Sequence, residues 1–595
     1  MSTHSARLAA LRAQLARQGL DGFVVPLTDE HMSEYVGDYA KRLGWLTGFR
    51  GSAGAAAVLP DKAAIFTDGR YTLQVRAQVS ADDWDYCDVP QASIADWLRD
   101  HAPTGSRIGY DPWLHTRDWV AATRATGVDL VPVVSNPVDA VWTDRPAQSL
   151  ATIAIQPTEL AGRSAPAKRA EIADWLTREG LDATVMTALD SIAWTFNVRG
   201  ADVTHTPVGL AFAILHADAT ADLFIAPEKI DEQIRAHLGN GVRLHDRAAF
   251  APMLATFSGK RIAADPERAV AAVFAALEAG GAELVARRDP AVLAKAIKNP
   301  TEQTGSRAAH ARDGAALTRY LHWLSVEAPE GALTEMSASD QLETFRRETG
   351  RLRDLSFDTI SGAGPNGAIM HYKASTETNR PIAPSSVYLC DSGGQYDDGT
   401  TDVTRTVWIG PGTPPDEVRD RFTRVLKGHI ALATAIFPEG TRGSQLDAFA
   451  RQFLWHAGVD YAHGTGHGVG SFLAVHEGPQ RIGKPGGGQA GTDEPLRAGM
   501  FLSNEPGYYK PGAFGIRIEN LVLVEPRDLP DAEQPMLGFE TLTFAPIDKT
   551  MIAPSLMTAE ERAWLDGYHA RVFATVAPQL AGDALAWAKA ACAPL

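Results

Sequence analysis

The sequence is poor in cysteine and contains no long apolar segment. Its 595 residues include three cysteines, Cys87, Cys390 and Cys592, and no two of them have the CxxC spacing of a redox or zinc motif. No apolar run approaches the roughly 20 residues that a membrane-spanning helix requires. A net charge of -16 excludes the basic excess that marks a nucleic-acid-binding surface. We therefore expect a reducing compartment, no disulfide framework, and no membrane or nucleic-acid partner.

Two features have both a functional and an ordinary interpretation. Cys390 directly precedes Asp391 and suggests a nucleophile, but a small buried strand residue explains it as well and is favoured. The stretch 1–19 places leucines at helical spacing among arginines, which fits a mitochondrial transit peptide or a first helix. A glycine ends this stretch and an apolar strand follows it directly. We therefore favour the helix and expect a cytoplasmic protein.

The length of the chain predicts several domains, because one hydrophobic core stops growing at roughly 250–300 residues. With 45% apolar and 22% charged residues, the composition is that of an ordinary globular protein. The expected fold class is α/β (α+β). The expected domains are two α/β domains at 1–145 and 146–297, a mixed domain at 298–550 and a helical extension at 551–595. A linker is expected at 136–146.

The first two expected domains alternate helices with short apolar strands. Strands are expected at 23–26, 55–59, 64–67 and 107–110, and again at 183–187, 209–215 and 221–225. Ser164 is the expected N-cap of a helix at 166–180. Residues 19–25 resemble residues 180–186. This faint repeat predicts a duplicated module, with chance similarity between two α/β domains as the alternative.

The third expected domain begins with a long helix at 298–324 and then changes character. Glycine, aspartate and β-branched residues become frequent, as in antiparallel strands joined by tight turns. Helices are expected again at 415–436 and 444–458. The tail at 558–592 is rich in alanine and leucine and is expected to be helical, capping the domain or building a dimer contact.

Two aspartates lie on the arms of a predicted hairpin at 387–406. An apolar strand ends at Asp391, an Asp–Gly pair turns the chain, and a Thr/Val-rich strand returns through Asp402. Two adjacent carboxylates at the end of a buried strand are costly unless a cation neutralises them. A metal ion is the simplest such cation. Asp397 and Asp398 lie at the turn, where solvated aspartates are expected.

A glycine-rich run at 463–470 contains His463 and His467. Its four glycines indicate backbone conformations or close approaches that other residues do not allow. The two histidines have i, i+4 spacing, but the glycines between them argue against a helical HExxH zinc motif. A phosphate-binding loop is also disfavoured, because no GxxxxGK[ST] pattern is present. We expect one histidine to be a metal ligand and the other to lie nearby in the pocket.

Two glutamates complete the candidate site. Glu505 follows an apolar strand, and Glu519 lies in the alternating run 515–520, where Arg517 shares its strand face. For each glutamate alone, a solvated or salt-bridged carboxylate is the favoured interpretation, and only the combination with the two aspartates and the histidine indicates a metal site. The four carboxylates contribute about -4, which two divalent cations balance. Such oxygen-rich ligation with one imidazole suits Mn²⁺, Co²⁺ or Fe²⁺ better than structural zinc, and two ions ~3.5–4 Å apart lower the pKa of a shared water.

These motifs resemble the metal-binding signature of the pita-bread metallopeptidases, and most closely the aminopeptidase P (Xaa-Pro aminopeptidase) family in its long, three-domain form. In the C-terminal half the resemblance lies in the double-aspartate hairpin and in residues 463–473, 475–479 and 504–509. In the N-terminal half it lies in residues 29–35, 48–54, 67–71 and 142–146. The resemblance implies two creatinase-like N-terminal domains followed by a pita-bread catalytic domain, commonly in a homodimer.

The resemblance also implies a role for each candidate ligand. Asp402 and Glu519 would bridge two metal ions, and Asp391 would complete the shell of one of them. His467 and Glu505 would bind the other ion, with Glu505 also serving as general base toward the bridging hydroxide. Mn²⁺ is the expected ion, with Co²⁺ or Zn²⁺ as alternatives.

Further residues are expected to act in catalysis and substrate binding. His371 resembles the family's histidine that helps to stabilise the tetrahedral intermediate. His463 and His476 resemble its pocket histidines around the proline and the scissile carbonyl. Arg517 resembles its substrate-side arginine, with an ordinary salt bridge to a nearby carboxylate as the alternative.

The implied activity is hydrolysis of the N-terminal Xaa-Pro bond of peptides that carry proline at the second position. This bond is a tertiary amide without an N–H, and proline fixes φ, so a dedicated pocket is needed. A prolidase, which cleaves Xaa-Pro dipeptides only, shares the ligands but usually lacks a duplicated N-terminal half of this length. Creatinase shares the fold without metals, and a catalytically inactive peptide-binding module would have lost ligands. All five candidate ligands are present here.

Overall fold

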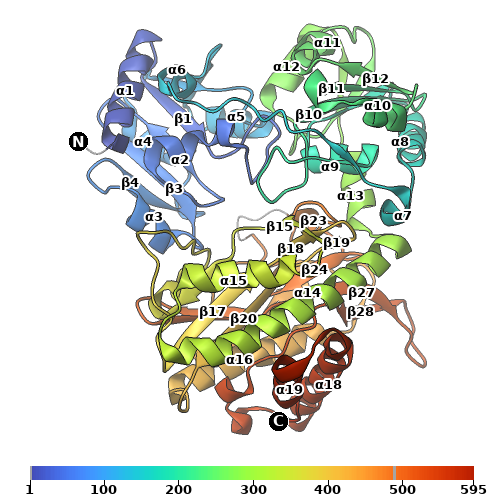
Figure 1. Cartoon of the computed structure of the whole chain (residues 1–595). Coiled ribbons are helices and arrows are strands. Elements are labelled where there is room, and N and C mark those ends of the chain that lie inside the picture. Colours follow the sequence, from blue (N-terminus) through green and yellow to red (C-terminus); the bar gives the residue numbers. More distant parts are fainter. Residues whose placement is uncertain (1–2, 487–490) are drawn as a thin grey trace. The chain divides into compact units, whose positions relative to one another are not determined.

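The computed structural model describes residues 3–486 and 491–595 (Figure 1). The chain divides into two compact units, Met1–Val292 (unit 1) and Leu293–Leu595 (unit 2). Within the described residues, no helix combines the length and apolar character that crossing a membrane requires.

The first half of unit 1 contains a six-stranded sheet in the order β4-β3-β2-β1-β5-β6. Its strands are β1 (Gly22–Pro26), β2 (Ala55–Val58), β3 (Ala63–Asp68), β4 (Asp85–Val89), β5 (Arg107–Tyr110) and β6 (Asp129–Pro132). Its helices are α1 (Thr3–Arg17), α2 (Arg42–Thr47), α3 (Thr72–Gln78), α4 (Ile94–His101), α5 (Arg117–Ala125) and α6 (Pro137–Val141). The four strands expected here from the sequence are confirmed.

The second half of unit 1 contains a sheet in the order β12-β11-β10-β8-β13-β14 and a small pair, β7 with β9. The strands are β7 (Ala154–Ile155), β8 (Ala183–Met186), β9 (Val198–Arg199), β10 (Ala211–His216), β11 (Ala221–Ile225), β12 (Val242–His245), β13 (Arg261–Ala264) and β14 (Glu283–Ala286). The helices are α7 (Thr158–Ala161), α8 (Ala165–Glu179), α9 (Leu189–Phe196), α10 (Glu232–Leu238), α11 (Phe250–Leu254) and α12 (Ala271–Ala279). The next helix, α13 (Pro290–Ala296), begins in unit 1 and ends in unit 2.

The two six-stranded sheets have the same topology. β1 pairs antiparallel with β2 and parallel with β5, and β8 pairs in the same way with β10 and β13. The outer pairs agree as well, because β3 with β4 and β11 with β12 are both parallel. The duplicated module that the sequence repeat predicted is therefore confirmed at the level of strand order and direction.

Local sequence signals explain several helices of unit 1. α1 buries its leucines Leu8, Leu11 and Leu15 in the core of the first sheet, as a packed first helix requires. The Ser164 hydroxyl accepts a hydrogen bond from the Ala167 N–H at the start of α8, so the predicted N-cap is confirmed. These contacts supply the apolar burial and the capping that set where each helix begins and packs.

The expected linker at 136–146 is partly wrong, because α6 occupies it. Asn136 caps this helix by accepting a hydrogen bond from the Val138 N–H, and Pro137 lies in its first turn. Val138 is fully buried against the first sheet. Asn136 and Pro137 therefore start a helix within the segment expected to be a linker.

Unit 2 contains four sheets, in the orders β15-β18-β19, β16-β17-β20, β21-β28-β27-β24-β22-β23 and β25-β26. The strands of the first half are β15 (Leu352–Leu355), β16 (Ile360–Ala363), β17 (Ser386–Ser392), β18 (Gly394–Tyr396), β19 (Gly399–Thr400), β20 (Val403–Ile409) and β21 (Phe437–Pro438). Those of the second half are β22 (Gly466–Gly468), β23 (Glu477–Ile482), β24 (Phe501–Asn504), β25 (Gly507–Lys510), β26 (Phe514–Arg517), β27 (Asn520–Arg527) and β28 (Met536–Thr541).

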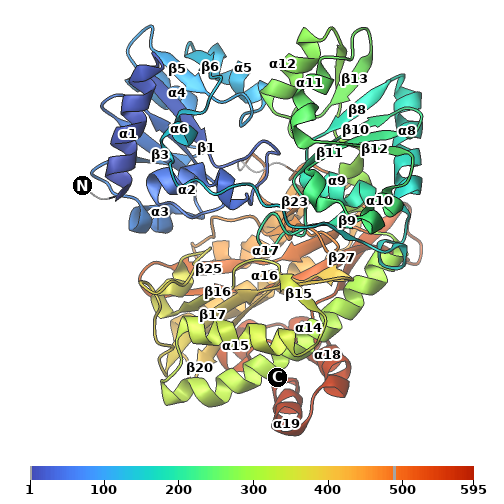
Figure 2. The same ribbon diagram turned by 45° about the horizontal axis from the view of Figure 1, so that its top comes forward.

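Helices cover the strands of unit 2 on two sides. They are α14 (Pro300–Glu327), α15 (Glu335–Arg347), α16 (Asp416–Ala433), α17 (Gly443–Trp455), α18 (Ala559–Val576) and α19 (Gly582–Ala591). α14 and α15 lie side by side and share a core with β17 and β20 (Figure 2). α16 and α18 share a second core with β26. The helices that the sequence predicted for this unit are confirmed.

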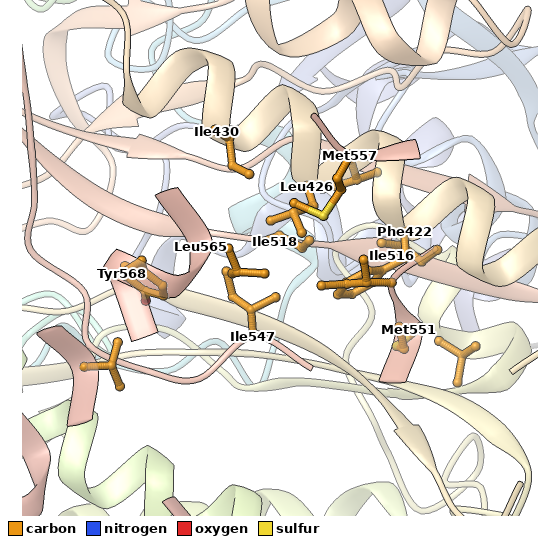
Figure 3. Close-up of a cluster of buried hydrophobic side chains, with 14 of the residues drawn as sticks. Phe422, Leu426, Ile430, Ile516, Ile518, Ile547, Met551, Met557, Leu565 and Tyr568 are labelled. Carbon is orange, nitrogen blue, oxygen red and sulfur yellow. The ribbon is translucent and has the colours of Figure 1, made fainter. Parts of the chain in front are cut away.

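The second core of unit 2 is built from large apolar side chains. Phe422, Leu426 and Ile430 on α16 lie near Ile516 and Ile518 (Figure 3). These two isoleucines alternate along the chain with residues of the candidate site. The apolar face of this segment therefore fixes where its polar face points.

Replacing Phe422 by alanine is expected to lower the free energy of unfolding of unit 2 by about 3–5 kcal/mol, because the side chain is fully buried and a cavity would remain. Chemical denaturation monitored by tryptophan fluorescence measures this loss. Phe449→Ala is the matched control, since Phe449 is 40% exposed and its loss is expected to cost about 0.5 kcal/mol or less. Equal losses for the two variants would contradict the assignment of this core.

Candidate metal centre

The predicted hairpin brings Asp391 and Asp402 together. β17 pairs antiparallel with β20, so that Asp391 lies opposite Thr404, and Asp402 directly precedes β20. The turn of the hairpin is formed by β18 and β19, which belong to a different sheet. Both aspartates are buried, with 7% and 4% of their surface exposed. The expected juxtaposition of two carboxylates is confirmed.

A second pair of strands places the two glutamates. β24 ends at Asn504 and β27 begins at Asn520, and these two asparagines are paired across the strands. Glu505 and Glu519 therefore flank one strand pairing. The Thr404 hydroxyl donates to Glu519 Oε2 at 2.7 Å, which ties this glutamate to the aspartate hairpin.

The expectation of one continuous strand through residues 515–520 is wrong. β26 ends at Arg517 and β27 begins at Asn520, in a different sheet. Ile518 and Glu519 form the step between them. The alternation still holds across the step, because Ile518 is buried in the apolar core while Glu519 lies among the polar groups of the site.

His467 lies in the short strand β22, which explains the surrounding glycines. A Cβ atom on Gly466 would lie 2.0 Å from the Ser503 carbonyl oxygen, and one on Gly468 would lie 2.4 Å from that of Glu477. His467 Nδ1 is 3.0 Å from the Gly468 carbonyl oxygen and therefore donates to it. Its Nε2 remains available as a ligand atom, facing the carboxylates.

The side chains converge on one small volume. Ligand atoms of Asp402, His467 and Glu519 lie within 4.8 Å of one another. His467 Nε2 is 3.4 Å from Asp402 Oδ2 and 3.6 Å from Glu505 Oε1. Four of the five predicted ligands, Asp402, His467, Glu505 and Glu519, thus lie next to one another. The assignment of these side chains as ligands stays a prediction.

The fifth predicted ligand, Asp391, joins the cluster through Arg517. Arg517 Nη2 donates to Asp391 Oδ2 at 2.6 Å, and its Nε donates to the Thr404 hydroxyl at 3.0 Å. The other carboxylate oxygen of Asp391, Oδ1, is buried without a hydrogen-bond partner among the described residues. This ion pair is the alternative that the sequence left open for Arg517, and contact with a substrate stays a prediction.

The electrostatics of the cluster favour cations. Burial raises the pKa values of Asp402, Glu505 and Glu519 above the ordinary carboxyl range, and the neighbouring carboxylates add to the effect. Burial also lowers the pKa of His467 to about 4, with His476 acting in the same direction, so the imidazole is neutral as a ligand must be. Arg517 supplies one positive charge to the four carboxyl groups. The donor set and the unpartnered Asp391 oxygen fit divalent cations.

The predicted pocket histidines lie around this cluster. His476 meets His467 edge to face, with ring centroids 4.3 Å apart. His463 Nδ1 donates to the Gly464 carbonyl oxygen at 2.7 Å. His371 directly follows Met370, whose carbonyl oxygen is 3.4 Å from Arg517 Nη1. The structure therefore brings His463 and His476 to the periphery of the same site, and for His371 it brings the preceding backbone there.

Tyr509 is a site residue that sequence reasoning missed. Its hydroxyl accepts from Arg517 Nη1 at 2.6 Å and donates to His463 Nε2 at 2.9 Å. It thus continues a chain of contacts from Asp391 through Arg517 to His463. The motif at 504–509 contained this tyrosine, but nothing in the sequence paired it with a residue 46 positions away.

Cys390 is buried in β17, and burial raises the pKa of its thiol to about 11. Such a thiol is a poor source of thiolate. The interpretation of Cys390 as a strand residue rather than a nucleophile is therefore confirmed.

Family models match most of the chain. The model of metallopeptidase family M24 matches residues 304–526, and that of the C-terminal region of peptidase M24 matches residues 535–595. Two models described as Creatinase/Prolidase N-terminal domain match residues 7–140 and 144–302.

Relatives are similar over nearly the full length. A probable Xaa-Pro aminopeptidase P from Laccaria bicolor is 42% identical over 99% of this chain and 93% of its own length. One from Paracoccidioides brasiliensis is 41% identical over 99% of both chains. The crystal structure of X-prolyl aminopeptidase from Caenorhabditis elegans, a cytosolic enzyme with a di-nuclear active site, matches with a TM-score of 0.94, 35% identity and 100% of both chains. The similarity extends through both units.

Proposed function

The chain is an enzyme that belongs to the Xaa-Pro aminopeptidases of metallopeptidase family M24, and from this premise we propose that it removes an N-terminal residue that precedes proline. The observation that carries the proposal is the buried cluster in which ligand atoms of Asp402, His467 and Glu519 lie within 4.8 Å. The dinuclear site of the Caenorhabditis elegans relative supports the same activity, since that enzyme matches this chain end to end.

The residues proposed to hold two divalent ions are Asp391, Asp402, His467, Glu505 and Glu519. Two such ions, when bound, supply a water of lowered pKa and polarise a carbonyl oxygen. The chain's own contribution is to fix the ligand atoms. Thr404 holds Glu519, Arg517 holds Asp391, and the Gly468 carbonyl oxygen sets the tautomer of His467.

The proposed roles of the remaining residues follow from their places around the cluster. Glu505 is the side chain proposed to accept a proton, and its Oε1 accepts a hydrogen bond from the Ser503 hydroxyl at 3.2 Å. His476 and His371 are proposed to contact the scissile carbonyl, and His463 the proline side of the pocket. Because both ring nitrogens of His463 have partners in the protein, its contact with substrate is through the ring carbons.

Four further proposals concern the state of the protein. Mn²⁺ is proposed as the native ion because oxygen ligands dominate the site, with Co²⁺ or Zn²⁺ as alternatives. The domains are proposed at 1–145, 146–297, 298–550 and 551–595, and a homodimer is proposed from the family resemblance. A cytoplasmic location is proposed because the Caenorhabditis elegans relative is a cytosolic enzyme.

The expected activity is tested with three peptides and the full-length chain supplied with Mn²⁺. A tripeptide with proline at the second position should lose its first residue. The proposed site accepts the tertiary amide that precedes proline and also the residue that follows proline. The same tripeptide with alanine at that position should react at least about 100-fold more slowly in kcat/KM, a difference of about 2.7 kcal/mol in transition-state binding. Mass spectrometry of the products identifies the bond that is cleaved.

The dipeptide arm of this assay separates the prolidase alternative. A strict prolidase would hydrolyse the Xaa-Pro dipeptide and leave the tripeptide intact. Equal cleavage of the proline and alanine tripeptides would instead indicate an aminopeptidase without a preference for proline. Either result would overturn the proposed specificity while leaving the metal site untouched.

A further inference from the structure

A buried cluster of three charges lies beside the proposed active site. The carboxylate of Glu477 is held between two ammonium groups, with Lys295 Nζ 2.8 Å from its Oε2 and Lys298 Nζ in an ion pair with its Oε1. No more than 1% of any of these three side chains is exposed. One carboxylate between two lysines leaves a net buried charge of about +1.

Burying three charged side chains in a core is energetically unfavourable compared with burying apolar ones. Lysine and glutamate are almost never fully buried unless they are paired, and replacing a buried ion pair by apolar residues is often neutral or stabilising. Burial lowers the pKa of the Lys298 ammonium, while Glu477 acts in the opposite direction. A contribution to stability therefore does not explain these three charged residues. Their position in the structure suggests that they hold a neighbouring group in place.

Glu477 lies at a point that controls the position of His476. It is the first residue of β23 and pairs with Gly468 of β22, the neighbour of His467. His476 directly precedes it and meets the His467 ring edge to face at 4.3 Å. A fixed Glu477 therefore fixes the backbone from which the His476 ring reaches into the site.

The two lysines are themselves firmly anchored. Lys295 lies in the last turn of α13. The Lys298 N–H donates to the Gly499 carbonyl oxygen at 2.9 Å, and its ammonium lies 5.4 Å from the centroid of the Phe501 ring in β24. The next residue, Asn299, is the N-cap of α14. Glu477 is thus clamped by groups that β24 and the start of α14 hold in place.

We propose that Lys295 and Lys298 are positioning residues for His476, acting through the carboxylate of Glu477. The proposal rests on the proposed function, because it takes His476 as a group that contacts the substrate there. Both lysines lie upstream of the segment 304–526 that matches the M24 family model. Both lysines and Glu477 belong to unit 2.

The test uses two variants of the full chain, Glu477→Gln and Lys295→Met, assayed on an Xaa-Pro tripeptide with Mn²⁺. Each is expected to lower kcat by about 10- to 100-fold, the usual loss when a supporting partner of an active group is removed. KM and bound metal should stay within twofold of the wild-type values. Lys295→Met is expected to fold, because it leaves a neutral Lys298–Glu477 pair.

A double-mutant cycle with His476→Ala distinguishes positioning from a general structural role. If the lysines and Glu477 act through His476, Glu477→Gln should change kcat by less than about twofold once His476 is gone. Asp202→Asn is the matched control, since it breaks a buried Lys229–Asp202 pair of 2.6 Å in unit 1. That variant should lower the unfolding midpoint and leave kcat unchanged.

Two results would overturn the proposal while the proposed function stands. One is a wild-type kcat in both Glu477→Gln and Lys295→Met. The other is a Glu477→Gln substitution that lowers kcat in the His476→Ala chain by the same factor as in the wild-type chain. A wild-type chain that cleaves no Xaa-Pro peptide would overturn the proposed function itself and this inference with it.

Discussion

Replacing Asp402 by asparagine is expected to lower kcat/KM for an Xaa-Pro tripeptide by about 10³-fold or more, which corresponds to about 4 kcal/mol or more of transition-state stabilisation. The substitution keeps the shape of the side chain and removes one negative charge from the centre of the cluster. Asp402 Oδ2 lies 3.4 Å from His467 Nε2, so the amide would occupy the same place. An amide is a weaker metal ligand than a carboxylate. Steady-state kinetics with added Mn²⁺ measure the effect.

Asp397→Asn is the control for this variant, because Asp397 lies in the turn of the same hairpin. Its carboxylate forms an ion pair with Arg353, whose side chain is 61% exposed, and such pairs contribute about 0–1 kcal/mol. The activity of Asp397→Asn should stay within about twofold of the wild type. An Asp402→Asn enzyme as active as the Asp397→Asn enzyme would remove Asp402 from the site.

Replacing Arg517 by methionine is expected to lower the free energy of unfolding of metal-free unit 2 by about 3–5 kcal/mol. The guanidinium is the group that Asp391 Oδ2, the Thr404 hydroxyl and the Tyr509 hydroxyl share. Its removal leaves buried carboxylates without their cation. With Mn²⁺ bound the loss should be smaller, because the ions replace the missing positive charge.

Denaturation of the Arg517→Met chain with and without Mn²⁺ measures both values. Arg353→Met is the matched control, since Arg353 pairs with Asp397 at the surface and its loss should cost about 0–1 kcal/mol in either state. Equal losses for Arg517→Met with and without metal would show that the arginine supports the fold and does not compensate the carboxylates of the site.

The sequence predicted the parts of the fold that depend on local patterns. Ser164 before a proline-containing helical stretch is a capping signal, and the cap is present. The apolar strand that ends at Asp391 and the Thr/Val-rich strand after Asp402 form the expected hairpin. In each case short-range chemistry decides the structure. α6 is the counter-example, because Pro137 starts a helix as readily as it marks a linker.

The features that the sequence did not predict depend on contacts between distant segments. The step at Ile518 and Glu519 arises because β26 and β27 belong to different sheets, and strand alternation alone does not reveal it. The contact of Tyr509 with His463 spans 46 residues, and that of Lys298 with Glu477 spans 179. A charged residue met in a sequence is expected at the surface, so buried lysines gave no signal.

The stoichiometry of bound metal shows whether the five side chains form a two-metal site. The full-length chain, loaded with Mn²⁺ and freed of excess ion, should contain two ions per chain by inductively coupled plasma mass spectrometry, because four carboxylates and one imidazole converge there. The Asp402→Asn chain, folded to the same extent by circular dichroism, should contain fewer than two. A wild-type chain that cleaves Xaa-Pro peptides without bound metal, or an Asp402→Asn chain that still binds two ions, would contradict the account.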